Sequence, residues 1–248
     1  MSGEWEEAEL PVGYRLEFRE TVESTNDEAR EAGRAGVEAG WVLVAERQAA
    51  GRGRRGAVWV CPAGEGLAFS VLLRPEEGKA LWPRLSLAVG LAVAEALERF
   101  GLSAEVKWPN DIWVGGRKIC GILVEAGEDF VVAGIGINVG VREFPGVLDQ
   151  SATSMAIERG EAPPRVAVLA AVLERLQVWA PCIGGRFDEL LRGLRERCAL
   201  TGKRVRMNAG GVVLSGEVAG IGDGGELLLR DASGLRKIVQ ADEVRVLP

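Results

Sequence analysis

The chain has 248 residues, of which 47% are hydrophobic and 27% are charged, and its formal net charge is −6. This length can hold one large domain and a small one, and the acidic balance disfavours a general nucleic-acid coat, which needs a broad basic face. Histidine is absent, so Ser–His catalysis, Cys–His catalysis and histidine-ligated metal sites are excluded.

Strands and helices alternate in the first part of the chain. Short apolar runs predict strands at 14–19, 41–46 and 67–73. Thr25, followed three residues later by Glu28, fits a capping box and predicts a helix over 25–33 that Thr25 caps. The clearest helix is 81–100, where apolar residues recur on one stripe and Pro83 suits the first turn.

The rest of the chain changes character twice. Strands are predicted at 104–107, 111–114, 117–125 and 130–139, and helices at 164–179 and 186–199. Gly115–Gly116 fits a two-residue hairpin turn. The glycine-rich tail has short strand patterns at 204–207, 212–219, 226–230, 237–240 and 244–247, which are typical of a small closed β-barrel. We therefore divide the chain into domains 1–199 and 200–248.

Cysteine usage and the first residues bear on the compartment. The four cysteines (Cys61, Cys120, Cys182 and Cys198) include no CxxC pair, which favours reduced thiols over a zinc site or a disulfide framework. The acidic N-terminus has no apolar signal segment, and no run approaches the ~20 apolar residues of a membrane span. We expect a cytoplasmic protein that does not enter a membrane.

The segment 48–56, with the sequence QAAGRGRRG, carries the strongest local signal. It interleaves three arginines with three glycines: Arg52, Arg54, Arg55, Gly51, Gly53 and Gly56. Glycine lets the backbone approach a ligand closely, and arginine offers a planar fork of donors to phosphate or carboxylate. On an acidic protein, this arginine loop predicts a mobile clamp that closes over an anion.

The strand pattern over 130–139 has two unlike faces. Residues 131, 133, 135, 137 and 139 form an apolar face, and Gly134, Gly136 and Asn138 form the other. Bare glycines in a strand mark the close approach of a ligand or of another backbone. A flat ring lying across the two glycines and a helix packed against them explain the pattern equally well.

Lys118 lies in the strand RKICGILVE, on the same face as Cys120 and Ile122 if the alternation is regular. A lysine on an apolar face needs an anionic partner, whereas an edge-strand lysine would only discourage aggregation. Both readings carry similar weight. Just before this strand, the stretch Lys107–Asp111 (KWPND) places a cation, an aromatic ring and a carboxylate at a turn.

Taken together and in order, these segments resemble the biotin–protein ligase family. The matching motifs are Ser24–Thr25–Asn26, the arginine loop followed by Trp59, KWPNDI at 107–112, KxxGIL at 118–123, GIGINV at 134–139 and the tail TGKRVRM…GEVAGIGDGGELLLRD. The resemblance runs from about residue 22 to the end. It implies an α+β fold: a mixed β-sheet with flanking helices, of the class II aminoacyl-tRNA synthetase and biotin ligase type, plus a C-terminal SH3-like β-barrel.

The resemblance also implies roles for individual residues. Biotin contacts are implied for Ser24, Thr25, Asn26, Gln48, Gly51, Arg52, Gly53, Arg54, Lys118 and Gly121. ATP or adenylate contacts are implied for Arg54, Arg55, Trp59, Asn110, Lys118 and Asn138. Lys118, Arg54 and Arg52 are the implied catalytic residues, whereas Lys107 and Asp111 belong to the motif without a defined role.

The implied activity is the ATP-dependent formation of biotinyl-5′-AMP and the transfer of biotin to a lysine of a biotin carboxyl carrier protein. The implied substrates are biotin and ATP with Mg²⁺, whose ligands the sequence leaves open. A chemistry of positioning and charge neutralisation by arginine, lysine and Mg²⁺ suits a protein without histidine. The resemblance is compatible with a homodimer.

Two alternatives remain. A lipoate–protein ligase or octanoyltransferase has a related catalytic domain, but such proteins lack a GRGRRG-type loop. A nucleic-acid-binding regulator could use the arginine loop and the barrel on a phosphate backbone. With only about twenty residues before Ser24, we expect no DNA-binding winged helix, and no GxxxxGK[ST] motif indicates a P-loop NTPase.

Overall fold

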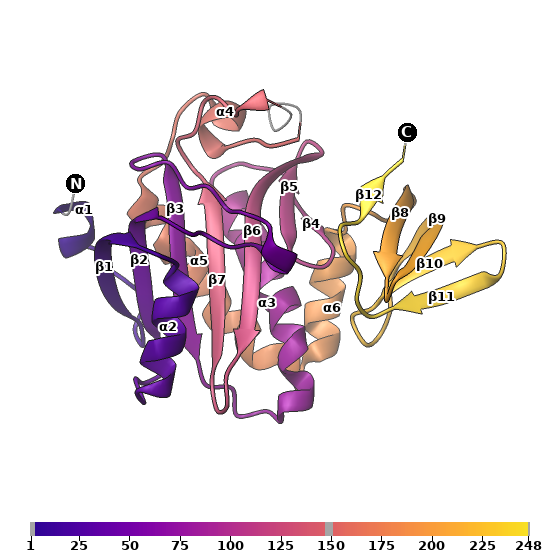
Figure 1. Cartoon of the computed structure of the whole chain (residues 1–248), viewed down its shortest axis with the longest axis horizontal. Coiled ribbons are helices and arrows are strands. Elements are labelled where there is room, and N and C mark those ends of the chain that lie inside the picture. The colour runs from indigo at the N-terminus through magenta and orange to yellow at the C-terminus, as the bar shows by residue number, and fades with distance from the viewer. Residues whose placement is uncertain (1–2, 147–150, 248) are drawn as a thin grey trace.

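A computed structural model describes residues 3–146 and 151–247. Its larger part is built on a seven-stranded mixed sheet (Figure 1). In spatial order the strands are β1 (Arg15–Val22), β2 (Trp41–Gln48), β3 (Gly66–Leu73), β7 (Val131–Asn138), β6 (Arg117–Ala126), β5 (Asp111–Val114) and β4 (Ala104–Lys107). β1 and β2 run parallel, and every other neighbouring pair in this sheet is antiparallel.

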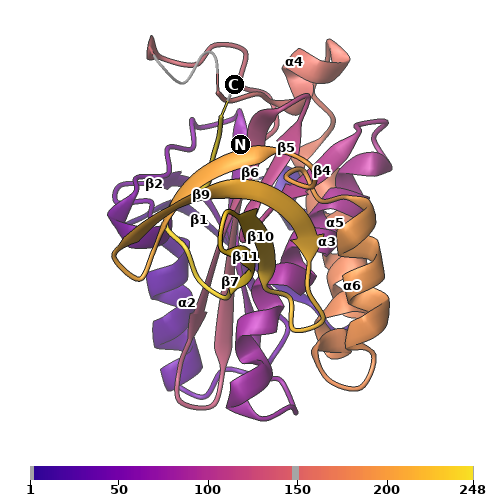
Figure 2. The ribbon, with the colours of Figure 1, turned by 90° about the vertical axis from the view of Figure 1, so that its right-hand side faces the viewer.

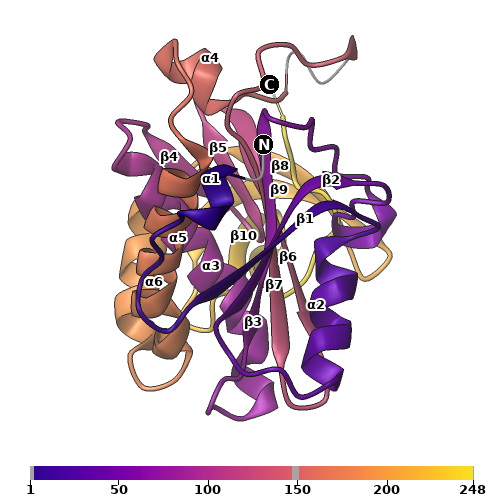
Figure 3. The same cartoon turned by 90° about the vertical axis from the view of Figure 1, so that its left-hand side faces the viewer.

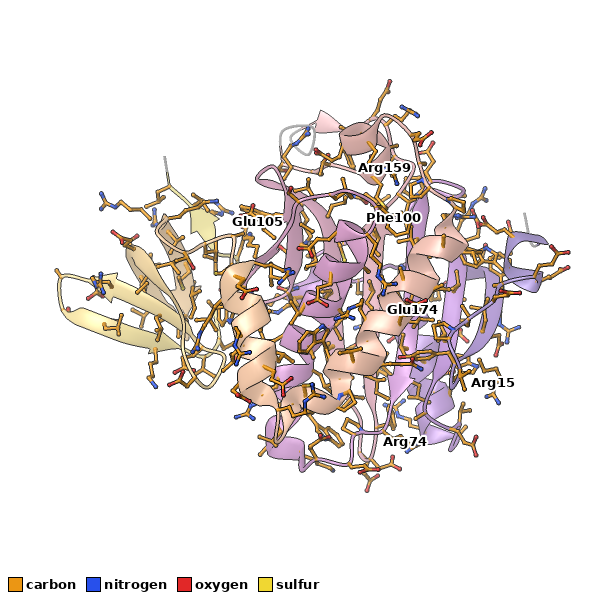
Figure 4. All side chains as sticks on the ribbon, turned by 180° about the vertical axis from the view of Figure 1, so that it is seen from behind. Arg15, Arg74, Phe100, Glu105, Arg159 and Glu174 are labelled. Carbon is orange, nitrogen blue, oxygen red and sulfur yellow. The ribbon has the colours of Figure 1, made fainter. Side chains whose placement is uncertain are left out.

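Helices lie on both sides of this sheet. Figures 2 and 3 show α2 (Thr25–Arg34) on one side, and α3 (Leu85–Glu98), α5 (Arg165–Trp179) and α6 (Phe187–Glu196) on the other. The short helices are α1 (Gly3–Glu6), α4 (Met155–Arg159) and the 3₁₀ turns η1 (Arg54–Gly56), η2 (Lys79–Arg84) and η4 (Ala180–Ile183). Figure 4 shows the three-helix face from behind, with Glu174 of α5 on its exposed side.

The main core lies between the sheet and the three-helix side. The apolar face predicted for β7 points into it, because residues 131, 133, 135, 137 and 139 all belong to this core. On the opposite face, Val132 and Phe130 pack under α2 in a smaller cluster. Toward the other end of β7 this same face carries Gly134, Gly136 and Asn138, so it has no apolar side chain there.

Two helical segments are long and apolar enough to cross a membrane by length and composition: Lys79–Glu98 and Arg165–Ile183. In the fold, α3 and α5 pack against each other inside the main core. Eleven of the residues of α3 are buried, including consecutive ones from Leu87 to Ala94. Because a core helix surrounded by protein needs apolar residues on all sides, burial accounts for the composition of α3.

The C-terminal part forms a second, five-stranded antiparallel sheet, in agreement with the predicted SH3-like barrel. Its spatial order is β11 (Gly234–Ile238), β10 (Leu227–Asp231), β9 (Val212–Ile221), β8 (Arg204–Ala209) and β12 (Arg245–Val246). The barrel is anchored on the larger part, since Trp108 Nε1 donates to Gly225 O at 3.0 Å and Arg195 Nε donates to Ile221 O at 2.8 Å. Trp108 is only 2% exposed, so this contact is dry.

Two local predictions were wrong. Thr25 does not cap α2, because its hydroxyl donates to Gln48 Oε1 instead. Ser24 stands at the N-cap position and makes no side-chain cap bond. The helix predicted over 81–100 is two elements, a 3₁₀ turn that contains Pro83 and then α3. A proline lacks the N–H that an α-helix interior requires, so regular helix starts only after it. The Gly115–Gly116 turn is confirmed, with positive φ at both residues.

Candidate active site

A cavity of about 670 Å³ opens on the bare face of β6 and β7. The start of α2, the arginine loop, the KWPND turn and the barrel segment 242–244 surround it. Twelve predicted site residues line it: Ser24, Thr25, Asn26, Gln48, Arg52, Gly53, Arg54, Arg55, Trp59, Asn110, Lys118 and Gly121. Segments that are distant in the sequence therefore meet at one cavity, whereas the ligand contacts implied for them stay predictions.

The two remaining predicted residues lie just outside the cavity lining. Gly51 is buried in the loop, where a Cβ atom would lie 2.4 Å from Trp59 O, so only glycine fits there. Asn138 is 6% exposed at the end of β7, and its Nδ2 donates to Thr153 O at 3.0 Å. Its contact with ATP stays a prediction.

One end of the cavity is a buried hydrogen-bond network. Gln48 Oε1 accepts from Thr25 N at 2.9 Å and from Thr25 Oγ1 at 3.1 Å. Ser70 Oγ lies 2.8 Å from Thr25 Oγ1 and 2.7 Å from Asn26 Oδ1. Because Gln48 Oε1 is engaged, its Nε2 amide is the group left to donate to a ligand. This end therefore presents polar groups that are held in place by hydrogen bonds within the protein.

Asn26 is fixed from three sides. Its Nδ2 donates to Leu123 O at 3.2 Å and to Glu125 Oε2 at 2.8 Å, and its Oδ1 lies beside Ser70 Oγ. The amide rests on bare backbone, because a Cβ atom on Gly134 would lie 2.0 Å from Asn26 Oδ1. Gly134 is therefore required for this packing.

A flat ring does lie across the next glycines, and it comes from the protein. The indole of Trp59 covers Gly136 and Gly121, where added Cβ atoms would lie 2.2 Å from Nε1 and 3.0 Å from Cζ3 respectively. Trp59 Nε1 is buried and has no hydrogen-bond partner among the described residues. Of the two readings of these glycines, helix packing holds at Gly134, where Asn26 of α2 lies, whereas Gly136 is covered by a ring of the protein itself, which neither reading specified.

Lys118 faces the cavity with an anionic partner, because Lys118 Nζ lies 2.6 Å from Asp111 Oδ1 and 5.6 Å from the centroid of the Trp59 ring. The predicted face was wrong, however. A β-bulge between Ile112 and Trp113 shifts the register, so that Ile119 as well as Cys120 is buried in the core. The bulge turns Lys118 away from Cys120 and toward the ligand side.

A second lysine shares the same carboxylate. Lys107 Nζ lies 3.8 Å from Asp111 Oδ2 and 4.8 Å from the centroid of the Trp113 ring. Burial lowers the pKa of Lys107 below the ordinary lysine value, although Asp111 opposes this effect. Two lysines with one carboxylate between them leave a surplus of positive charge, which suits a polyanionic ligand.

Residues of the arginine loop line the cavity. The backbone of the loop passes in front of the sheet toward the barrel (Figure 1). Arg52 Nη2 lies 2.5 Å from Asp27 Oδ1 and 3.3 Å from Glu125 Oε2. Arg54 donates to Asn110 Oδ1 and to Ala241 O, each at 3.1 Å. The guanidinium of Arg55 pairs with Asp242. Burial lowers the pKa of Arg54, and the charge of Arg55 adds to that effect.

Several residues of the site were missed by sequence reasoning. Ser70 carries a usable signal, since it is the one hydroxyl in the apolar strand GLAFSVLL. The acids Asp27, Glu125 and Asp242 carry no local signal, because each is an ordinary surface residue until the fold brings it to an arginine.

Comparison with known proteins agrees with the family resemblance of the sequence motifs. The model of the biotin/lipoate A/B protein ligase family matches residues 18–141. The bifunctional ligase/repressor BirA of Bacillus spizizenii is 35% identical over 93% of this chain and 74% of its own length. The biotin–[acetyl-CoA-carboxylase] ligase of Paracoccus denitrificans is 34% identical over 90% of this chain and 97% of its own.

A solved structure agrees over the same range. The biotin protein ligase from Aquifex aeolicus, in complex with biotin and ATP, superposes with a TM-score of 0.85 and 33% identity. The match covers 94% of this chain and 99% of the Aquifex chain, so it includes both sheets. On its motifs, its fold and these relatives, the chain belongs to the biotin/lipoate A/B protein ligase family.

Proposed function

We propose that this chain is a biotin–[biotin carboxyl carrier protein] ligase. One observation carries the proposal: a single cavity joins a polar head-group end, a glycine floor covered by Trp59 and a cluster of cations. A ligand that fits all three parts has a compact polar head, an apolar middle and an anionic tail. Biotin has this form, and biotinyl-5′-AMP extends it with a nucleotide.

In the first step, a carboxylate oxygen of biotin attacks the α-phosphorus of ATP, the bond from that phosphorus to the α,β-bridging oxygen breaks, and pyrophosphate leaves with the electron pair. Both reactants are anions, so the catalyst must hold them together and offset their repulsion. Lys118 and Arg54 stand beside the cavity where the new anhydride would lie, and Lys107 adds positive charge behind them. Good orientation alone can contribute about 7–11 kcal/mol to such a step.

Mg²⁺ fits this site as a companion of the nucleotide. Within the described part of the chain, no three His, Cys, Asp or Glu side chains gather to form a cage for a metal ion. Mg²⁺ is commonly held by one or two carboxylates together with substrate phosphates, and Asp111 and Glu243 line the cavity. The ion would neutralise phosphate charge when bound.

In the second step, a neutral lysine amine of the carrier attacks the acyl carbon of the mixed anhydride, and AMP leaves with the electron pair of the broken C–O bond. Water can attack the same carbon and waste the intermediate. The arginine loop lies over the cavity, so the same loop that binds the phosphate can exclude water until the carrier arrives.

The partner we propose is the biotin carboxyl carrier domain of a biotin-dependent carboxylase. The reaction consumes ATP, and the four cysteines are free thiols, which together favour the cytoplasm as its location.

The test is incorporation of biotin into a carrier fragment, with ATP and Mg²⁺, detected by streptavidin. Omission of ATP should abolish labelling, and an acceptor Lys→Arg carrier should remain unlabelled. A parallel reaction with lipoate and a lipoyl carrier separates the two branches of the family. Labelling with lipoate alone would replace the proposal by a lipoate ligase, and no labelling in either arm would leave a binding protein.

A further inference from the structure

We propose that Asp242 of the C-terminal barrel is a positioning residue for the adenylate site, which holds the arginine loop closed through Arg55. The inference rests on the proposed function and goes beyond it, because it gives the barrel a part in retaining the intermediate. The evidence lies at the junction of the two sheets, where two consecutive arginines contact two consecutive barrel residues.

The first contact fixes Arg54. Its Nη1 donates to Asn110 Oδ1 and its Nη2 donates to Ala241 O, so one guanidinium joins the KWPND turn to the barrel. The orientation of Asn110 is itself set, because Asn110 Nδ2 donates to Ile122 O at 2.8 Å. Ala241 is fully buried, so its carbonyl presents a stationary acceptor.

The second contact acts on the backbone of the loop. Within the described residues, Arg55 is the one non-glycine residue with a positive φ, at 55°. The left-handed conformation is unfavourable for a non-glycine residue, so surrounding contacts must hold it there. Two contacts support it: the backbone hydrogen bond from Ala57 N to Arg54 O, which spans Arg55, and the ion pair between Arg55 and Asp242. Loss of the ion pair would remove one of the two and favour relaxation of the loop.

The barrel is itself fixed to the larger part of the chain, so it can support the Arg55–Asp242 ion pair, which we call the latch. Trp108 Nε1 to Gly225 O and Arg195 Nε to Ile221 O anchor it on the larger part. At the other end of the loop, Arg52 is held by Asp27 of α2 and Glu125 of β6. The loop thus spans the cavity between acids of the catalytic part and an acid of the barrel. Both ends must hold for the cavity to stay covered.

Opening the barrel end would expose the intermediate to water. A water oxygen would attack the acyl carbon, the bond from that carbon to the AMP oxygen would break, and the products would be biotin and AMP. This leak needs no carrier, whereas productive turnover does. The ratio of AMP released to carrier labelled therefore reports whether the loop stays closed.

The experiment compares Asp242→Asn, Asp242→Glu and the control Asp223→Asn in the full chain. Asp223 is a barrel acid whose side chain is 96% exposed and paired with Arg195, so its replacement removes the same charge away from the cavity. Each protein is loaded with biotin and α-labelled ATP, freed of excess nucleotide, and followed for AMP release without carrier. Thermal unfolding of each variant checks that it folds.

We expect Asp242→Asn to release AMP about fivefold to tenfold faster than wild type, with biotin-dependent ATP–pyrophosphate exchange largely retained. Asp242→Glu should restore slow release, and Asp223→Asn should match wild type. Equal release from Asp242→Asn and wild type would overturn the latch, as would the same acceleration in Asp223→Asn. If wild type itself forms no biotin-dependent adenylate, the proposed function fails rather than the latch.

Discussion

The floor of the cavity, formed by β6, β7 and the residues packed on them, differs in construction from its lid, which is the arginine loop. The floor is buried and hydrogen-bonded, with Asn26 4% exposed and Ser70 fully buried. The lid is exposed and held by charge, since the side chains of Arg52 and Arg55 are 37% and 50% exposed. Breaking a buried hydrogen-bond network leaves polar groups unsatisfied, whereas exposed ion pairs contribute only about 0–1 kcal/mol each. The floor is therefore held by the stronger set of contacts and the arginine loop by the weaker set.

The cations of the cavity fall into two groups by the element that carries them. Lys107 and Lys118 belong to strands of the sheet, next to Asp111, and we call them rooted. Arg52, Arg54 and Arg55 belong to the arginine loop. A rooted cation keeps its place before and after the nucleotide binds, which is the condition for electrostatic stabilisation without reorganisation. The following predictions test whether the floor and the lid behave as differently as they are built.

The largest effect is expected for Lys118→Ala. It removes the cation that lies 2.6 Å from Asp111 and leaves that carboxylate without its nearest counter-ion in the cavity. Loss of a group that stabilises charge in a reaction typically costs 10²–10³-fold in rate, roughly. The measurement is biotin-dependent ATP–pyrophosphate exchange, with Lys79→Ala, an exposed lysine outside the cavity, as the control. Full exchange in the Lys118 variant would remove it from the reaction.

Gly134→Ala should damage the floor. The new methyl group would lie 2.0 Å from Asn26 Oδ1, and Asn26 cannot yield because three neighbours hold it. We expect the free energy of unfolding to fall by about 1–3 kcal/mol, together with weaker biotin binding. Denaturant unfolding and biotin titration measure the two effects. Unchanged values in both would mean that this end of the cavity is not held in place by its hydrogen bonds.

Gly136→Ala is the matched change under the lid. Its methyl group would lie 2.2 Å from Trp59 Nε1, but Trp59 follows the arginine loop and can swing away. We expect a smaller loss of stability than in Gly134→Ala, together with faster limited trypsin cleavage at the loop arginines. Should both glycine variants lose equal stability with the loop still protected, the lid would be as rigid as the floor.

The smallest effect concerns pH and Lys107. Because burial lowers its pKa, Lys107 loses its proton at a lower pH than an exposed lysine, and the cavity then loses positive charge. The KM for ATP should rise a few-fold on the alkaline side, and Lys107→Arg should move that rise to higher pH. The effect on stability runs the other way. Because the pKa of Lys107 is lower in the folded protein than in the unfolded chain, the free energy of unfolding rises as pH rises between these two pKa values. An identical alkaline profile in Lys107→Arg would contradict the assignment.

The sequence predicted the sheet best in strands whose side chains alternate regularly between the two faces. The two faces of β7 were correct because a regular strand alternates strictly, and β4 and β5 were placed at their observed bounds. The same rule misplaced Lys118, since one bulge next to Trp113 shifts the alternation. The cap of α2 was misassigned for a related reason: Thr25 has a tertiary partner, Gln48, that a local pattern cannot show.

The sequence by itself determined the composition of the site: which residues are glycine, where the arginines cluster, and that no histidine chemistry is available. It did so because motifs state residue types and spacing. Only the tertiary structure decided the partners of those residues. Asp27, Glu125 and Asp242 become counter-ions, and Trp59 becomes the cover of Gly136, because the folded sheet and barrel bring together segments that are up to 187 residues apart in the chain. Charge and packing act through space, and the sequence alone does not give those distances.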